Sequence, residues 1–239
     1  QSRFSNFVVR RLRKGNKYVQ SASLCLQNHL ENHLLIAADR LHAARIDDEQ
    51  INNSVITSSQ AMDILHRISV FCSRRTEELG SAGASHLLLK KRGLCRTNAQ
   101  DIFKDTENTK IYTLELPTGY GKTLTALSVA LSSIARGECQ RIIYVAPYIS
   151  ILSRAADEIR KATGLDVLVH HHLSALNRIP EEDIDEELES IYLDSWLAPT
   201  IATTYNQLFR ALFPIRSQHT LRLTGFQNAF IIIDEPQSI

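Results

Sequence analysis

Residues 115–123 read Glu-Leu-Pro-Thr-Gly-Tyr-Gly-Lys-Thr and stand between an apolar run and a run with helical spacing. Two glycines let a backbone turn tightly and present its N–H groups to an anion. A helix that begins at such a turn adds the positive end of its dipole. Lys122 can then reach the outer phosphates of ATP, and the Thr123 hydroxyl can hold Mg²⁺. We expect this phosphate-binding loop to consist of Pro117, Thr118, Gly119, Tyr120, Gly121, Lys122 and Thr123.

A second acidic element follows far along the chain. Residues 230–233 form an apolar run typical of a buried strand, and Asp234 and Glu235 come directly after it. Asp234 would hold Mg²⁺, directly or through water, and Glu235 would polarise the attacking water. The alternative is a strand that ends in solvated acids. We expect Lys122, Asp234 and Glu235 to be the catalytic residues.

The apolar pattern beyond residue 92 alternates between short runs and helical periodicity. It predicts strands at 111–116, 141–146, 166–169, 199–203 and 229–233, with helices at 124–134, 151–162 and 205–213. Such alternation is typical of an α/β fold with a parallel sheet covered on both faces, which binds nucleotide at the carboxyl ends of the strands. Residues 4–92 are poor in glycine and predict an all-helical segment, with a loop at 46–59 and a break at 80–84.

Composition narrows the class of protein. The chain has 239 residues, 44% of them hydrophobic, which is enough for a sizeable core. No apolar stretch approaches the ~20 residues of a membrane span, and no signal peptide opens the sequence. The four cysteines lack C-x-x-C spacing and do not indicate zinc. We therefore expect a cytoplasmic protein with no membrane partner.

Charge is distributed unevenly along the chain. Residues 1–95 carry 14 basic and 8 acidic side chains, whereas the remainder carries 13 and 18. The first 17 residues hold six of the bases and no acid, which suits nucleic acid or, alternatively, a solvated helix face. Residues 180–194 hold eight acids and no base, which is typical of a solvated surface helix, with metal binding as the alternative. The six basic residues among the first 17 are Arg3, Arg10, Arg11, Arg13, Lys14 and Lys17.

Several segments resemble the motifs of superfamily 2 helicases. The segment lacks the glycine that opens a strict G-x-x-x-x-G-K-T loop and has Pro117 in its first half, and this P-T-G-x-G-K-T form is the one found in that superfamily. Residues 234–237, Asp-Glu-Pro-Gln, resemble its D-E-x-H or D-E-x-Q box. Residues 145–152 look like motif Ia and residues 200–208 like motif Ib, which contact the backbone of one nucleic-acid strand. The resemblance implies nucleic-acid contacts from Pro147, Tyr148, Thr203 and Thr204.

The combination of these motifs is similar to the CRISPR-associated helicase-nuclease of type I systems. That resemblance implies a RecA-like helicase domain over 93–239, preceded at 1–92 by the end of an HD nuclease domain, as an internal piece of a longer protein. It implies ATP-driven 3′-to-5′ movement on single-stranded DNA exposed by an RNA-guided surveillance complex, and DNA degradation by the linked nuclease. Asp39 would ligate the divalent transition metal of that nuclease; the alternative is a capped or paired acid on an apolar helix. The chain contains no His-Asp dipeptide, which the nuclease site requires.

Other interpretations stay open. The motifs also fit an RNA helicase or a restriction-enzyme motor, and a chain without a second RecA-like domain fits a nucleotide-dependent binding module without turnover. The run His170 to His172 suits a loop near the nucleic-acid path better than a metal site, because neighbours on a strand point to opposite faces. Gln100 is a weak candidate for adenine recognition.

Overall fold

The computed structural model describes residues 31, 33, 35–43, 46–78, 84–106, 110–171, 191, 193–214 and 216–238. The basic cluster at residues 3–17, His172 and all of the acidic segment except Asp194 and residues 191 and 193 lie outside the described residues. Among the described helices, none combines the length and apolar character needed to cross a membrane.

The first described part of the chain is helical. Residues 35–43 are helical, and helices α3 (Asp48–Asn53), α4 (Ser58–Glu78) and α5 (Ala84–Asp105) follow. The expected loop at 46–59 is wrong because two capping boxes begin helices inside it. Asp47 and Gln50 exchange backbone–side-chain hydrogen bonds of 3.0 and 2.8 Å at α3. Thr57 and Gln60 do the same, at 2.9 and 3.3 Å, where α4 begins.

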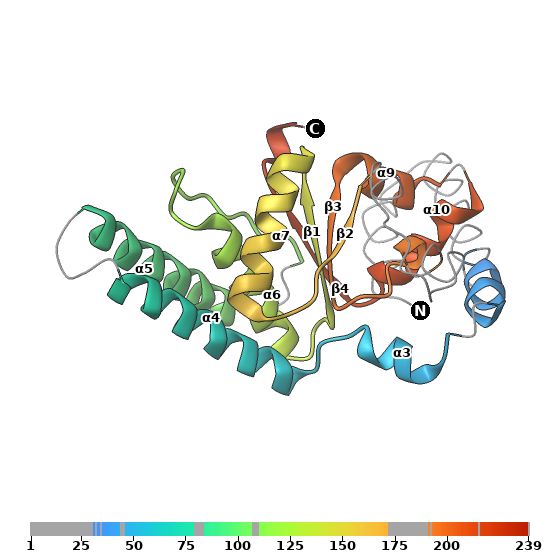
Figure 1. Cartoon of the computed structure of the whole chain (residues 1–239), viewed down its shortest axis with the longest axis horizontal. Coiled ribbons are helices and arrows are strands. Elements are labelled where there is room, and N and C mark those ends of the chain that lie inside the picture. The colour runs from blue at the N-terminus through green and yellow to red at the C-terminus, as the bar shows by residue number, and fades with distance from the viewer. Residues whose placement is uncertain are drawn as a thin grey trace.

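The second part is a parallel four-stranded sheet in the order β2-β3-β1-β4. Its strands are β1 (Arg141–Ala146), β2 (Leu168–His170), β3 (Thr200–Thr204) and β4 (Ala229–Ile233). The main helices between them are α6 (Lys122–Ala135), α7 (Ile149–Thr163) and α9 (Tyr205–Leu212). Shorter elements are α10 (Ser217–Leu221), η1 (Arg222–Phe226) and η2 (Pro236–Ser238). The predicted α/β, RecA-like fold is confirmed (Figure 1).

Both faces of the sheet are buried. Ile142 and Tyr144 of β1 point to one side, where they share a core with α4, α6 and α7. Ile143 and Val145 point to the other side, into a core built around the fully buried Trp196 together with α9 and η1. This continuous burial explains why β1 reads as an unbroken apolar run.

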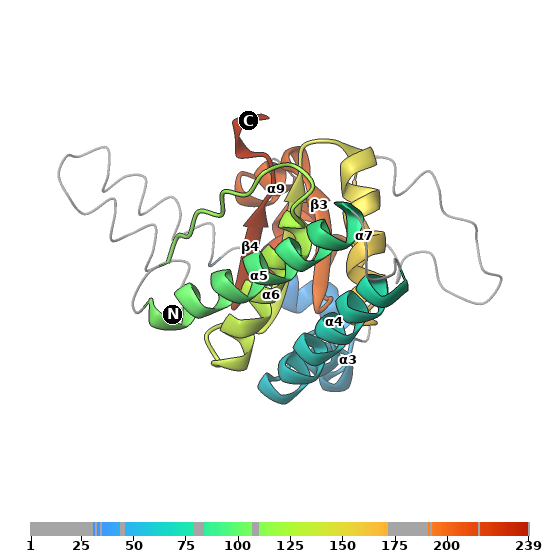
Figure 2. The ribbon, with the colours of Figure 1, turned by 90° about the vertical axis from the view of Figure 1, so that its left-hand side faces the viewer.

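The helices α4 and α5 form an outer layer over α6 (Figure 2). Ile64 and Ile68 of α4 lie in the same core cluster as Leu127 and Leu131 of α6. Helix α5 runs without a break through residue 92, where the sequence pattern predicts a domain boundary. The helical segment and the sheet therefore share one hydrophobic core in the described structure.

The strand expected at 111–116 does not form. Within the described part of the chain, these residues pair with no strand, and β4 pairs with β1 alone. Ile111 is 58% exposed and Leu114 is 38% exposed. Tyr112 packs instead against Phe103 of α5, with 5.1 Å between ring centroids. The prediction was wrong because strand-like composition gives a strand only where a neighbour accepts its backbone hydrogen bonds.

Candidate nucleotide site

The phosphate-binding loop lies at the beginning of α6, next to the carboxyl edge of the sheet. Gly119 and Gly121 both adopt left-handed backbone conformations, with φ of 84° and 79°, and Gly121 is the N-cap residue of α6. The Tyr120 amide donates to the Pro117 carbonyl at 3.2 Å and closes the turn. Side-chain-bearing residues adopt this conformation at a cost, so glycine at these two positions allows the loop to take this shape without strain. The helix that follows directs its first N–H groups toward the loop.

The acidic pair is held by the end of β4. The Asp234 amide donates to the Val145 carbonyl at 2.9 Å, which extends the β1–β4 pairing by one residue. The Tyr144 hydroxyl donates to Asp234 Oδ2 at 2.7 Å, and the Tyr205 hydroxyl donates to the Asp234 carbonyl oxygen. Glu235 then turns away from the strand direction with φ of 52°. Two tyrosines and one backbone bond thus fix the position of Asp234.

The loop and the acidic pair meet although they are 113 residues apart in sequence. Lys122 Nζ lies 3.2 Å from Glu235 Oε1. A hydrogen bond from Gln237 and the nearby Lys122 ammonium hold the pKa of Glu235 below its ordinary value. Burial and the contact with Asp234 raise the pKa of the Tyr144 hydroxyl. At neutral pH the site therefore holds an ionised Glu235 and a neutral Tyr144 that donates to Asp234.

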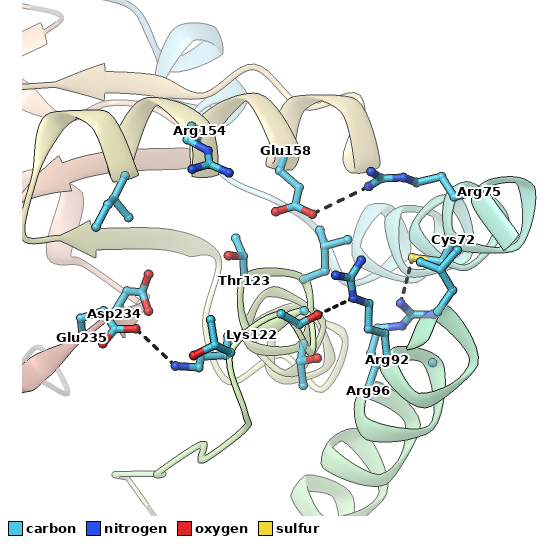
Figure 3. Close-up of a pocket in the computed structure, with 18 residues that line it drawn as sticks. Cys72, Arg75, Arg92, Arg96, Lys122, Thr123, Arg154, Glu158, Asp234 and Glu235 are labelled. Atoms are coloured by element: carbon cyan, nitrogen blue, oxygen red, sulfur yellow. Dashed lines mark hydrogen bonds and ion pairs between the residues drawn. The ribbon is translucent and has the colours of Figure 1, made fainter. Parts of the chain in front are cut away.

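A cavity of about 440 Å³ opens beside the loop (Figure 3). The predicted residues that line it are Thr118, Gly119, Gly121, Lys122, Thr123, Asp234 and Glu235. Pro117 and Tyr120 belong to the same turn but do not line the cavity. The volume lies in the range of small-molecule sites, roughly 300–1,000 Å³.

The donor atoms near Asp234 fit Mg²⁺. The Thr123 hydroxyl contacts the Tyr144 hydroxyl, which in turn contacts Asp234, so oxygen atoms gather at one point. Magnesium prefers oxygen ligands and is commonly bound by one or two carboxylates together with substrate phosphates. No group of three or more His, Cys, Asp or Glu side chains suited to a metal occurs among the described residues.

The predicted nucleic-acid contacts lie at the carboxyl ends of β1 and β3, which are neighbours in register. Tyr148 is 63% exposed at the N-cap of α7, and Pro147 before it is half-buried. Thr204 is the N-cap of α9 and is 7% exposed. Thr203 is fully buried and donates its hydroxyl to the His170 carbonyl at 2.8 Å. The structure thus brings Pro147, Tyr148 and Thr204 to one edge, while the Thr203 side chain lies inside.

Three further residues lie away from this site. Asp39 is exposed on the helical stretch 35–43, and among the described residues no set of ligands surrounds it that would fit a transition metal. His170 is buried on β2, where its Nδ1 accepts a 2.8 Å hydrogen bond from Trp196. Gln100 donates to Ser132 at 3.3 Å. Because Ser132 is ten residues along α6 from Lys122, about 15 Å, Gln100 faces the far end of that helix.

Sequence reasoning missed several residues of the site. Tyr144 and Tyr205 support Asp234, Gln237 contacts Glu235, and Arg92 of α5 donates from Nε to the Gly119 carbonyl at 2.6 Å. A hydroxyl-bearing ring inside the otherwise aliphatic β1 was a usable signal, since a buried tyrosine usually finds a polar partner. No spacing rule connects Arg92 with a glycine 27 residues later.

Comparison with known proteins agrees with this geometry. Residues 73–236 match the family model described as type III restriction enzyme, res subunit. Over 155 aligned residues the chain is 34% identical to the CRISPR-associated nuclease/helicase Cas3 of Haloferax volcanii. That alignment covers 56% of this chain and 16% of the relative, so the chain spans a small part of the relative's length. The predicted resemblance is confirmed, and the chain belongs to the type III restriction enzyme res-subunit family of superfamily 2 helicase domains.

Proposed function

We propose that this chain is the first RecA-like domain of an ATP-driven translocase on single-stranded DNA, and that it works within a longer CRISPR-associated helicase-nuclease. The observation that carries the proposal is the convergence of Lys122 and Thr123 with Asp234 and Glu235 around one cavity. The two pairs are far apart in the sequence, since 113 residues separate Lys122 from Glu235. A phosphate loop that meets an acidic pair in this way is the arrangement required for nucleoside triphosphate hydrolysis.

In this proposal the triphosphate of ATP rests against the loop amides and the N-terminus of α6. Lys122 exchanges its Glu235 partner for phosphate oxygens, because an incoming triphosphate carries more negative charge than one carboxylate. Glu235, released from Lys122 and ionised, orients the attacking water. Thr123 and Asp234 would hold Mg²⁺, which supplies charge neutralisation of the phosphates when it is bound.

In this proposal, nucleic acid binds at the carboxyl ends of β1 and β3, on the sheet edge that also carries the nucleotide site. Tyr148 offers an exposed ring for a base and its backbone N–H for a phosphate, directly after the half-buried Pro147, and the Thr204 hydroxyl lies at the neighbouring end of β3. Recognition of this kind does not read sequence, which suits a translocase. Movement would follow from closure against a second RecA-like domain with different affinities in each nucleotide state.

The nuclease and its transition metal belong to the longer protein in this proposal. Asp39 is a candidate ligand only if residues outside the described part of the chain complete the site, because it is exposed and lacks neighbouring ligands there. Recruitment by an RNA-guided surveillance complex is likewise a proposal. Its support is the similarity to the Haloferax relative.

The family match favours one alternative, a motor of the restriction-enzyme type. ATP hydrolysis by the longer protein, measured with single-stranded DNA, double-stranded DNA or single-stranded RNA, separates the candidates. Stimulation by single-stranded DNA supports the proposed function. Stimulation by double-stranded DNA alone points to the restriction-type motor, and stimulation by RNA alone points to an RNA helicase.

The nucleotide assignment is tested by Lys122→Ala. Calorimetric titration of the chain with Mg²⁺ and ATPγS should show a loss in affinity of about 10- to 100-fold, the value of one hydrogen bond to a charged group. The matched control is Lys161→Ala, which removes the same charge from an exposed position on α7 outside the cavity. Equal affinity for ATPγS in Lys122→Ala and the unaltered chain would refute the proposal.

A further inference from the structure

The cavity beside the loop extends well beyond the residues that the family motifs identify. Its one end is formed by the loop and the acidic pair. Its other end is formed by side chains from α4, α5 and α7, among them four arginines (Figure 3). Both ends line one cavity of about 440 Å³, so a single open space joins the loop to the arginines. The four arginines are Arg75, Arg92, Arg96 and Arg154.

The charges in this cavity are not balanced. Five basic side chains line it against three carboxylates, Glu158, Asp234 and Glu235, a formal net charge of +2. Two of the basic groups have acidic partners. Lys122 lies 3.2 Å from Glu235, and Arg75 lies 4.0 Å from Glu158.

The three other arginines have no carboxylate partner among the described residues. Arg92 donates to the Gly119 carbonyl at 2.6 Å, and Arg96 donates to the Cys72 sulfur at 2.9 Å. Arg154 is exposed on α7 and projects toward the cavity (Figure 3). Neutral partners leave the positive charge uncompensated, and a cavity that contains several such groups attracts anions.

The chemistry of the lining indicates which anion fits. Guanidinium groups pair with phosphate oxygens through two parallel N–H donors. No aromatic ring belongs to the described residues that line the cavity, so a purine base would find no ring to stack on there. Arg92 already contacts the phosphate loop itself, which places its guanidinium beside the expected phosphates.

We propose that Arg92, Arg96 and Arg154 form a second wall of the triphosphate site and bind phosphate oxygens from the side opposite Asp234 and Glu235. The inference rests on the proposed function, because it takes the ligand of the loop to be a nucleoside triphosphate. It adds a cationic wall supplied by helices that precede the loop and by α7. Phosphate charge is thereby held between Lys122 and three guanidinium groups.

The test uses two ligands on the whole chain, inorganic tripolyphosphate and ATPγS with Mg²⁺, each titrated calorimetrically. Arg154→Ala is the first variant, since its side chain supports no other described element. It should weaken both ligands by about tenfold, the lower end of the range for one charge-assisted hydrogen bond, because Arg154 is exposed to solvent. Arg92→Ala and Arg96→Ala should do the same, and the ratio of the two affinities should stay constant. Thermal unfolding of each variant confirms that the fold persists.

Matched controls lie on the same helices. Lys91→Ala removes an exposed charge next to Arg92 on α5, and Lys161→Ala removes one on α7, both outside the cavity. Their affinities should stay within about twofold of the unaltered chain, as for solvent-screened charges. Arg154→Lys keeps the charge but loses the fork, and it should recover part of the affinity.

The outcomes separate this inference from the function on which it rests. If Lys122→Ala weakens tripolyphosphate binding and none of the three arginine variants does, the second wall is refuted and the nucleotide site stands. If the arginine variants weaken ATPγS alone, they contact the nucleoside and the inference is wrong. If they weaken neither ligand but lower the affinity for single-stranded DNA in a parallel titration, the cavity serves nucleic acid and the inference also fails. If Lys122→Ala changes neither ligand, the proposed function itself fails.

Discussion

Residues 111–116 and residues 229–233 have similar strand-like compositions, and each leads directly into one half of the site. Residues 229–233 form β4, pair along β1 in register and carry Ile232 into the core at 8% exposure. Residues 111–116 pair with no strand in the described structure and expose Ile111 and Leu114. The same local pattern therefore gives a paired strand with one buried residue, Ile232, in one case and an unpaired segment in the other.

This difference changes how each half of the site is positioned. The sheet fixes the acidic pair, through the bond from the Asp234 amide to Val145 and the hydroxyl of Tyr144. Helices fix the phosphate loop, through the start of α6 and through Arg92 of α5. Strand composition predicts an element, but only a pairing partner determines whether that element can hold the site residues next to it in place.

The largest expected effect compares one apolar residue from each segment. Ile232→Ala should lower the free energy of unfolding by about 2–4 kcal/mol, because it empties a packed core position. Leu114→Ala should change it by less than about 0.5 kcal/mol, as for other surface substitutions. Urea unfolding of the two variants measures both values. Equal destabilisation would mean that residues 111–116 are packed as a strand after all.

The second comparison concerns the glycine that shapes the loop. Gly119→Ala should destabilise by about 1–2 kcal/mol, since an added Cβ makes a left-handed backbone costly. No atom lies within 4 Å of that Cβ, so a clash adds nothing. Gly93→Ala is the control, because Gly93 lies within α5 and also has no neighbour within 4 Å of its Cβ. It should stabilise by about 0.5–1 kcal/mol, and a stabilising Gly119→Ala would contradict the argument.

Sequence reasoning identified most of the fold and much of the site. It placed β1 and β4 at their observed bounds and α6, α7, β3 and α9 within two residues. The strands pair with neighbours in the sheet and the helices pack on its faces, so the apolar pattern was sufficient. It failed at residues 111–116 and 46–59, where pairing and capping decide the outcome.

The missing site residues share one physical cause. Tyr144, Tyr205 and Arg92 reach the site through contacts of 90, 29 and 27 residues in sequence separation. Tyr144 and Arg92 belong to no motif, and Tyr205 lies in the segment that resembles motif Ib without being identified there as a support of Asp234. Their roles depend on which elements pack together. Motifs identify residues that touch the ligand, whereas residues that hold those side chains emerge only from the tertiary structure.

The third expected effect tests the support of the acidic half. Tyr144→Phe keeps the ring in the core and removes the hydroxyl that donates to Asp234 Oδ2. Loss of this bond should lower the free energy of unfolding by about 1 kcal/mol. The Mg²⁺ concentration needed for ATPγS binding should also rise, because Asp234 becomes less well oriented. An unchanged Mg²⁺ titration would show that the sheet backbone alone positions Asp234.

The smallest expected effect concerns the charge of Glu235. Its pKa lies below the ordinary value of 4.5, and the hydrogen bond from Gln237 is the largest cause, followed by Lys122. Gln237→Ala should therefore raise the pKa of Glu235 toward 4.5, measured by NMR titration of the side-chain carboxyl carbon. Ser238→Ala, at an exposed neighbour, should leave it unchanged.

The sign of the accompanying pH dependence is set by the lowered pKa. The native contacts favour the ionised carboxylate, so their stabilising contribution is complete above pH 4.5 and is lost as the pH falls through the lower native pKa. The difference in stability between the unaltered chain and Gln237→Ala should therefore be present at neutral pH and vanish in acid. If the difference in stability instead grows in acid, Gln237 favours the protonated form of Glu235. Glu235 would then not be held ionised, as its proposed role of orienting the attacking water requires.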